Sequence, residues 1–455
     1  MTREQEMTGG LKRLGTAAAV ILLGTVTGHH AAAQSIVPQP IPAGYGFPTD
    51  KAVIEAWIAT NDETAMRTHA WGLWAGMGAD SGQSYNGQPL PVWETWFGSE
   101  EVFQPAPLTS VLASRGTPSR QFIEPNQFHH HRSAVGAAAD PQSDMQVVSF
   151  NKFNPEAAHF IMTPQAGPGG QTYRYNSQAS LQALNNAWPA GTPLQDRAIV
   201  DFPTRGIETK PVMSLVKATG LTPMPLWQGP AASTNSTNPT PETWKTCVLV
   251  DPQGSGGVRP ATAQEVAGAN PASGLACETY LYGPLSLLYS FPLTAGEAQA
   301  FNAAQGSGAE AGDYAVLSAM HVNTKETTNW TWQTFWWQPG GDTPNGFPGS
   351  KANMPPQMPA PWDNYAMCTA YSQTTTPGGS TMRVCFNPYL ETSPGIPAGI
   401  TSNCVSCHGV ARVAANPNDE TYPLSYDKPI ALFTDPAYFT GTTHTDFSWA
   451  IPGAK

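Results

Sequence analysis

Apolar side chains recur at intervals of three and four residues in the N-terminal part of the chain, which is the spacing of one face of an α-helix. The clearest pattern predicts two consecutive helices, over residues 51–60 and 63–77. Shorter helices are predicted over residues 155–161 and 177–188. Polar residues that favour helix N-caps precede the first two helices. The expected caps are Thr49 or Asp50 for the first helix and Asn61 or Asp62 for the second.

Beyond residue 198 the pattern changes to short runs rich in branched and aromatic residues, which are typical of β-strands. The predicted strands cover residues 198–202, 210–218, 224–227, 245–250, 280–291, 313–322 and 330–337. The last run is unusually aromatic, and we expect it to be a strand packed on both faces, with the lining of a cavity as the alternative. Its large side chains are Trp330, Trp332, Phe335, Trp336 and Trp337.

Composition limits how regular this fold can be. The 455 residues include 43 Gly and 44 Pro, so long helices cannot dominate and much of the backbone must form loops and short strands. We therefore expect an α+β fold that is β-rich, with many irregular loops. The N-terminal part contributes helical segments, and the C-terminal half is β-patterned.

The segment GPAASTNSTNPTPET, residues 229–243, has the composition of a linker. It would separate an N-terminal mixed α/β region, residues 34–228, from a C-terminal region, residues 244–455. A loop of this composition can also cross a single core. The two regions are therefore expected either as two domains or as one unit.

The first 33 residues have the pattern of an export signal. Lys12 and Arg13 precede LGTAAAVILLGTVTG, an apolar run shorter than a typical membrane span, and AAAQ offers a cleavage site after Ala33. The alternative is an N-terminal membrane anchor that is not cleaved. We expect a Sec-type signal peptide and a mature protein exported to a bacterial periplasm.

The stretch NCVSCHGV, residues 403–410, carries the most specific chemistry in the chain. Cys404 and Cys407 are three residues apart, so on one helical turn their thiols face the same way and can each add to a vinyl group of one haem. His408 follows directly and can ligate the haem iron on its proximal side. The spacing predicts one covalently bound haem c. A zinc half-site would need a second pair of ligands, and a thioredoxin-like dithiol would need an early βαβ unit; the sequence has neither pattern.

The remaining four cysteines form an even set that suits an oxidising compartment. We expect Cys247 to pair with Cys277, across a loop rich in Gly and Pro, and Cys368 to pair with Cys385. The second pair flanks the turn TTTPGGST between two β-patterned runs, so a hairpin would bring its thiols together. Four cysteines allow three connectivities, and the other two remain alternatives at this stage.

The second axial ligand of the iron has no clear signal, because no Met follows His408. The candidates are His321, His444 and Met367. On a strand pattern Leu317, Ala319 and His321 share one face, which would point His321 inward. Each candidate also has a structural alternative: a hydrogen-bonded histidine at 321, a solvent-facing loop residue at 444 and a core side chain at 367.

The net charge of the chain narrows the classes of molecule that it is expected to bind. The chain carries 22 Lys and Arg against 33 Asp and Glu, a formal net charge of −11, which argues against binding to nucleic acid or to anionic membranes. It suits a neutral or basic redox partner, such as a dehydrogenase, an oxidase or a small carrier. Three consecutive histidines, His129 to His131, are expected in an exposed loop, since neighbouring side chains cannot easily share one ion.

The segment HVNTKETTNWTWQTFWW, the run FNPYLE and the motif CVSCH resemble the sequences of large exported bacterial monohaem cytochrome c family proteins. The resemblance covers about residues 313–411 and implies haem attachment at Cys404 and Cys407 with proximal ligation by His408. It does not imply the ordinary small cytochrome c fold for so long a chain. The expected function is one-electron transfer. The alternative is a haem enzyme, peroxidase-like or acting on a small substrate, with an open distal site.

Overall fold

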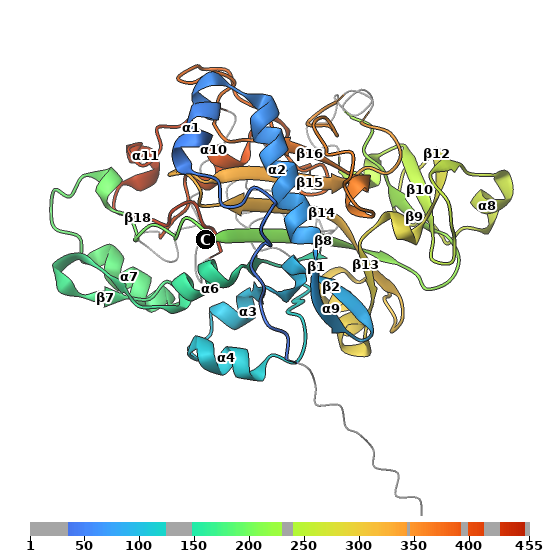
Figure 1. Ribbon diagram of the computed structural model, residues 1–455, viewed down its shortest axis with the longest axis horizontal. Helices are drawn as coiled ribbons and strands as arrows, with labels where there is room; N and C mark the ends of the chain where they lie inside the picture. The colour runs from blue at the N-terminus through green and yellow to red at the C-terminus, as the bar shows by residue number, and fades with distance from the viewer. Residues whose placement is uncertain are drawn as a thin grey trace, which may run out of the picture. The chain divides into compact units, whose positions relative to one another are not determined.

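The computed structural model describes residues 35–123, 148–229, 240–343, 346–392, 399–413 and 428–450. The protein is a mixed α+β structure with mostly antiparallel sheets, as the sequence predicts (Figure 1). The predicted signal peptide, the three consecutive histidines and most of the predicted linker lie outside the described residues.

The largest sheet has eight strands and is antiparallel at every pairing. Its main path runs β16-β15-β14-β8-β5-β3, with β13 beside β14 and β4 beside β8. The strands are β3 (Phe97–Gly98), β4 (Val148–Ser149), β5 (Lys152–Phe153), β8 (Ile207–Val216), β13 (Ser290–Pro292), β14 (Tyr314–Thr324), β15 (Thr331–Trp337) and β16 (Tyr365–Thr369). Because β8 and β14 come from opposite sides of the predicted linker, the two regions share one sheet.

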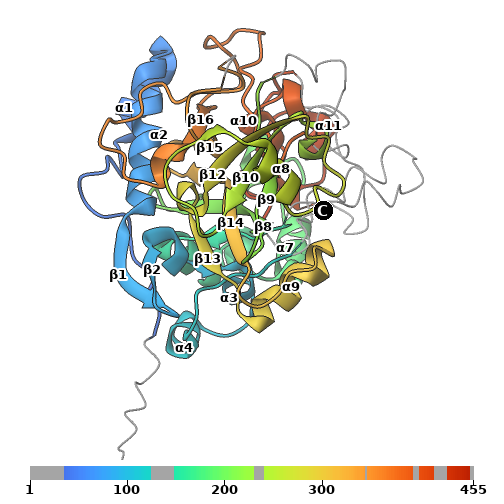
Figure 2. The same cartoon turned by 90° about the vertical axis from the view of Figure 1, so that its right-hand side faces the viewer.

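A second sheet has four strands in the order β11-β12-β10-β9, and only its central pair, β10 with β12, is parallel. Figure 2 shows this sheet on the side that faces the viewer, with α8 beside it. Its strands are β9 (Thr222–Pro225), β10 (Thr246–Asp251), β11 (Arg259–Pro260) and β12 (Thr279–Pro284). Three two-stranded ladders complete the β-structure of the described residues: β1 (Asp80–Tyr85) with β2 (Gln88–Pro91), β6 (Gln165–Ala166) with β7 (Thr172–Tyr173), and β17 (Arg412–Val413) with β18 (Thr443–His444).

The helices predicted from periodicity are present with their expected caps. The Asp50 side chain accepts a hydrogen bond from the Ala52 N–H at the start of α1, and Asp62 accepts one from Ala65 at the start of α2. These bonds satisfy backbone donors that a helix N-terminus leaves unpaired. The α-helices are α1 (Lys51–Thr60), α2 (Glu63–Gly78), α3 (Ser99–Val102), α4 (Leu108–Ser114), α6 (Pro155–Met162), α7 (Gln178–Asn186), α8 (Ala263–Gly268), α9 (Ala295–Gln305), α10 (Cys404–His408) and α11 (Pro436–Phe439).

The eight-stranded sheet has a hydrophobic core on each face. Helix α2 crosses one face (Figure 1), where the Trp74 ring stacks on Phe335 of β15 with ring centroids 4.2 Å apart. On the opposite face, Trp332 and Trp336 belong to a second core together with Val405 of α10. Every residue of β15 is buried. The aromatic run is therefore a strand packed on both sides, as predicted, and it separates α2 from α10.

A β-bulge in β14 corrects the expected pattern of faces. The pairing of β14 with β8 shifts register between Leu317 and Ala319, so one extra residue, Ser318, reverses the alternation. Leu317 joins the core under α2, whereas Ala319 joins the core on the side of α10. The prediction that Leu317, Ala319 and His321 share a face is wrong for Leu317, because alternation alone cannot reveal a bulge.

Three predicted strands also differ. Residues 198–202 form only an isolated bridge, from Ala198 to His444. The predicted strand 280–291 is interrupted by a 3₁₀ turn over Leu285–Leu287, which separates β12 from β13. The run 381–390 is not the second strand of a hairpin, and its only ladder contact is the bridge from Met382 to Thr374. No helix in the described residues is long and apolar enough to cross a membrane.

Candidate functional site

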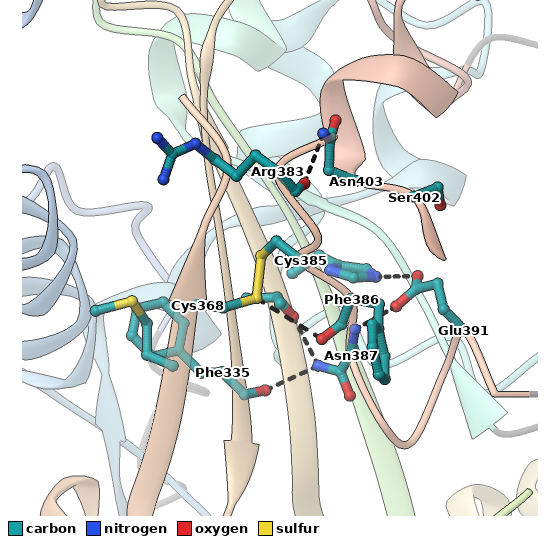
Figure 3. The surroundings of a disulfide bond; sticks show 12 residues. Phe335, Cys368, Arg383, Cys385, Phe386, Asn387, Glu391, Ser402 and Asn403 are labelled. Carbon is teal, nitrogen blue, oxygen red and sulfur yellow. Dashed lines mark hydrogen bonds and ion pairs between the residues drawn. A yellow bond between two sulfur atoms is a disulfide. The ribbon is translucent and has the colours of Figure 1, made fainter. Parts of the chain in front are cut away.

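The CVSCH motif forms the short helix α10, and Asn403 fixes where it begins. The Asn403 Oδ1 atom accepts a hydrogen bond of 3.0 Å from the Ser406 N–H. The Asn403 Nδ2 atom donates to the carbonyl oxygens of Gln373 and Arg383, at 2.9 and 2.8 Å; Figure 3 shows the bond to Arg383. One buried side chain thus caps the helix and ties it to the loop that follows β16.

The four other cysteines pair as predicted. Cys247 is bonded to Cys277, and Cys368 to Cys385, with Cα atoms 5.6 and 5.8 Å apart. The first bridge joins β10 to the segment before β12. The second does not lie across a hairpin. Figure 3 shows the disulfide between Cys368 and Cys385. Instead of a hairpin partner, the Cys385 N–H donates a hydrogen bond of 3.0 Å to the carbonyl oxygen of Ser402, two residues before the motif.

Cys404 and Cys407 are the two free cysteines among the described residues, and both are partly buried. Burial raises the pKa of each thiol, and the negative charge of Glu391 raises it further; the pKa of Cys407 rises to about 12. Both groups therefore remain neutral thiols near pH 7. A thioredoxin-like dithiol needs the opposite, a stabilised thiolate.

His408 makes one hydrogen bond that fixes the tautomer of its neutral ring. Its Nδ1 atom lies 2.8 Å from the carbonyl oxygen of Phe447, and because a carbonyl only accepts, Nδ1 must carry the proton. The lone pair of Nε2 is then free to bind a metal. Burial lowers the pKa of His408 to about 4, which the Phe447 bond partly opposes, so the ring is neutral at pH 7. Its ring packs on Trp332 with centroids 4.4 Å apart.

A polar cluster on the same face of the sheet lies near the motif. Lys210 of β8 pairs in register with His321 of β14. The His321 Nε2 atom lies 2.7 Å from Glu391, whose other carboxylate oxygen accepts a bond of 2.6 Å from the Asn387 N–H. Burial lowers the pKa of Lys210 to about 7, opposed by Glu391 and Cys407. His321 and Lys210 also lower the pKa of His408. Lys210 and Glu391 were not predicted, because only tertiary contacts bring them here.

His444 is buried, which corrects the expectation of a solvent-facing loop residue. Its side chain is enclosed by aromatic rings, with the ring of Phe433 at 4.0 Å, and burial lowers its pKa to about 3. The Nδ1 atom accepts a hydrogen bond of 3.0 Å from the Asp446 N–H, so the proton is on Nε2. That nitrogen is buried without a partner among the described residues. In this tautomer neither nitrogen offers a free lone pair.

Met367 does not join this cluster. It pairs with Phe335 across β15 and β16 and lies in the core under α2, whereas the neighbouring Cys368 lies in the core on the side of α10. Successive strand residues point to opposite faces, so the sheet separates Met367 from Cys404. Among the residues described, no group of three His, Cys, Asp or Glu side chains is placed to hold a metal ion.

A buried carboxyl lies near the C-terminal side of the same site. Glu208 of β8 accepts hydrogen bonds of 2.9 and 3.2 Å from the Ser448 hydroxyl. Burial raises its pKa to about 7. Nearby, the Lys325 ammonium group forms a buried ion pair of 2.5 Å with Asp446. These contacts fasten the segment after β18, which supplies the Phe447 carbonyl, to the central sheet.

Comparison of the chain with protein-family models, with curated proteins and with solved structures gave no match in any of the three. The chemistry of the site therefore rests on the motif and on the geometry around it.

Proposed function

We propose that this chain is an exported c-type cytochrome that carries one haem, bonded to Cys404 and Cys407 and ligated by His408, and that it transfers single electrons. The observation that carries the proposal is the hydrogen bond from His408 Nδ1 to the Phe447 carbonyl. It fixes the proton on Nδ1, and because burial keeps the ring neutral, the lone pair of Nε2 is left free, which is what an axial iron ligand requires. When bound, the haem supplies a one-electron ferric/ferrous couple.

The donor set fits this cofactor. The thiols of Cys404 and Cys407 are free, whereas the other four cysteines form disulfides. Because Cys404 and Cys407 are three residues apart on one helical turn, their thiols point to the same side of the helix. Trp332 supports the His408 ring from the sheet, so the ligand is held by a rigid element. The hydrogen bonds of Asn403 to Gln373 and Arg383 and of His408 to Phe447 tie both ends of the helix to the rest of the chain.

The two disulfides also support export, because such bonds persist mainly in oxidising compartments. With the signal-like segment at residues 1–33 they favour a periplasmic location. The formal net charge of −11 favours a neutral or basic redox partner. Such surface charge would change the rate at which the partner associates more than the affinity of the complex.

A second function, a haem enzyme with an open distal site, is favoured by the contacts of the distal candidates. His444 has no free lone pair, and Met367 lies across the sheet. His321 donates its Nε2–H to Glu391, so only its Nδ1 lone pair could bind the iron. If none of them moves on haem binding, the sixth position is left to a small molecule.

The first experiment tests attachment. The full chain is produced in a bacterium with haem c maturation enzymes, and the purified protein is examined by intact mass and absorption spectroscopy. We expect a mass increase of one haem and a Soret band, both abolished in Cys404→Ser/Cys407→Ser. Cys247→Ser/Cys277→Ser is the matched control, since it also removes two sulfurs, and it should keep the haem. A wild-type protein without added mass and Soret absorbance overturns the proposal.

The second experiment separates the two functions in the haem-loaded protein. A low-spin ferric spectrum and a ferrous form indifferent to carbon monoxide support electron transfer. A high-spin ferric spectrum with rapid carbon monoxide binding supports the open-site enzyme instead.

A further inference from the structure

The buried carboxyl of Glu208 lies on the same face of the central sheet as the ring that supports His408. Glu208 of β8 is paired with Asn323 of β14, and Asn323 is paired with Trp332 of β15. Directly paired residues point to one face of a sheet, and neighbouring strands are about 4.8 Å apart. Glu208 is therefore about 10 Å from Trp332, whose ring packs on His408 with centroids 4.4 Å apart.

A second connection from Glu208 to His408 runs through the segment after β18. Glu208 accepts hydrogen bonds of 2.9 and 3.2 Å from the Ser448 hydroxyl. Ser448 directly follows Phe447, whose carbonyl oxygen lies 2.8 Å from His408 Nδ1. A carbonyl that accepts from a ligand histidine fixes the orientation of the ring and raises its basicity. The Glu208 carboxyl thus holds the segment that holds the ligand.

Ionisable side chains from several elements surround Glu208 and the neighbouring Asp446. They are Lys210 of β8, Tyr173 and Tyr175 at the end of β7, Asp201, and Lys325 after β14. Lys210 is two residues along β8 from Glu208 and so lies on the same face. Burial raises the pKa of both tyrosines, so they stay protonated near neutral pH. The Lys325 ammonium group lies 2.5 Å from Asp446.

Three of these groups change charge near neutral pH. Burial, with a smaller effect of Asp446, raises the pKa of Glu208 to about 7, although hydrogen bonds from neighbouring side chains oppose the rise. Burial also raises the pKa of Asp446 to about 6, against the effect of Lys325, and lowers the pKa of Lys210 to about 7. Glu208 is the one that is bonded to the segment carrying the His408 acceptor.

We propose that Glu208 is a positioning residue of the haem site and that it couples proton uptake to reduction of the iron. The inference rests on the proposed function. When one electron arrives from the redox partner, one unit of positive charge is lost beside His408, and the Glu208 carboxylate takes one proton from water to become a neutral carboxyl. On oxidation the electron leaves to the partner and the proton returns to water. No other reactant is needed.

The sign of this coupling follows from electrostatics. A carboxylate stabilises the ferric state more than the ferrous state, because the ferric state carries one more positive charge. The midpoint potential should therefore fall as pH rises through the pKa of Glu208. A unit charge on the order of 10 Å away, at an effective dielectric constant of about 20, changes a one-electron equilibrium about tenfold. That change is about 59 mV.

Potentiometric titration of the haem-loaded, full-length protein between about pH 5 and about pH 9 tests the coupling, because this range spans the pKa of Glu208. Glu208→Gln should match wild type at the acidic end and favour the ferrous state about tenfold more than wild type at the alkaline end. Glu278→Gln, which removes the same charge from an exposed ion pair with Lys245, should follow the wild-type profile. A fall in Glu208→Gln equal to that of wild type assigns the proton to another group, such as Asp446 or Lys210, and overturns the proposal.

Infrared difference spectroscopy between the reduced and oxidised protein identifies the group that takes the proton. Near pH 7 we expect the carbonyl stretch of a protonated carboxyl to appear on reduction of wild type and to be absent in Glu208→Gln. A band of equal size in both proteins, or no band in wild type, shows that Glu208 does not take up the proton.

Ser448→Ala tests the same link with the charge of Glu208 left in place, and it also serves if Glu208→Gln does not fold. The Ser448 hydrogen bond lowers the pKa of Glu208, so its loss should move the fall in midpoint potential to higher pH. An unchanged profile contradicts the proposal. A wild-type chain without attached haem overturns the proposed function and this inference with it, whereas a haem-loaded protein whose potential does not vary with pH overturns this inference alone.

Discussion

The backbone N–H of Cys385 donates a hydrogen bond of 3.0 Å to the carbonyl oxygen of Ser402. Cys385 is bonded to Cys368 near the end of β16, and Ser402 lies two residues before Cys404. The disulfide therefore anchors the chain that enters α10. A helix of only five residues cannot maintain its own position in water, so this anchor and the Asn403 cap hold the motif against the sheet.

Removing this anchor should loosen the motif selectively. In Cys368→Ser/Cys385→Ser we expect the free energy of unfolding to fall by about 3 kcal/mol, as for a closed loop of this length. We also expect faster amide hydrogen exchange in the peptide that covers residues 402–408. Chemical denaturation and exchange mass spectrometry measure the two effects.

The variant Cys247→Ser/Cys277→Ser provides the comparison. It opens a loop of 30 residues rather than 17, so its global destabilisation should be at least as large. Exchange in residues 402–408 should nevertheless stay close to wild type once global stability is matched. Equal acceleration in both variants would show that Cys385 does not anchor the motif.

The buried pair of His69 and Glu326 should contribute strongly to stability. Glu326→Ala leaves His69 Nε2 and the Thr49 N–H without their acceptor. At about 1 to 3 kcal/mol for each unsatisfied donor, we expect a loss of about 2 to 6 kcal/mol. Glu278→Ala breaks the exposed ion pair with Lys245 and should cost less than about 1 kcal/mol. Urea denaturation measures both, and similar losses would contradict the role assigned to the buried pair.

Glu208 should give the protein a stability that falls as pH rises. The pKa of Glu208 is about 7 in the folded protein, against an ordinary value of about 4.5 for an exposed glutamate in the unfolded chain. Between pH 4.5 and pH 7 the folded state therefore binds more protons than the unfolded state. The contribution of Glu208 to stability is present below pH 4.5 and is lost as pH rises through 7.

Glu208→Gln keeps an acceptor for the Ser448 hydroxyl and removes this titration. Relative to wild type, the variant should therefore gain on the order of 3 kcal/mol between pH 4 and pH 8. Asp446, whose pKa is also raised, is present in both proteins and cancels in the difference. Denaturation at a series of pH values tests this, and a difference that does not change with pH would refute it.

If the chain carries the proposed haem, substitutions of two of the distal candidates should have different effects on its spectrum. Met367→Leu should leave the ferric absorption spectrum unchanged, because Met367 lies in the core under α2 and the swap conserves volume. His321→Leu should alter the spectrum, because His321 acts electrostatically on His408. A spectral change in Met367→Leu with none in His321→Leu would reverse this assignment.

Much of the local structure follows from short-range patterns. The helices α1 and α2 were predictable because periodicity and caps lie within a few residues of each other. The turn of CVSCH was predictable for the same reason. Both disulfide pairings were also predicted, although the hairpin expected for Cys368 and Cys385 is absent and the actual contact is with Ser402.

The sequence by itself determined which residues carry the candidate chemistry, because Cys404, Cys407 and His408 are adjacent in the chain and one helical turn fixes their relation. Only the tertiary structure decided what surrounds them. A single bulge at Ser318 reverses the faces of β14, burial encloses His444, and β8 and the loop after Cys385 bring Lys210 and Glu391 to the motif. These outcomes depend on contacts between residues far apart in sequence, and local propensity carries no information about such contacts.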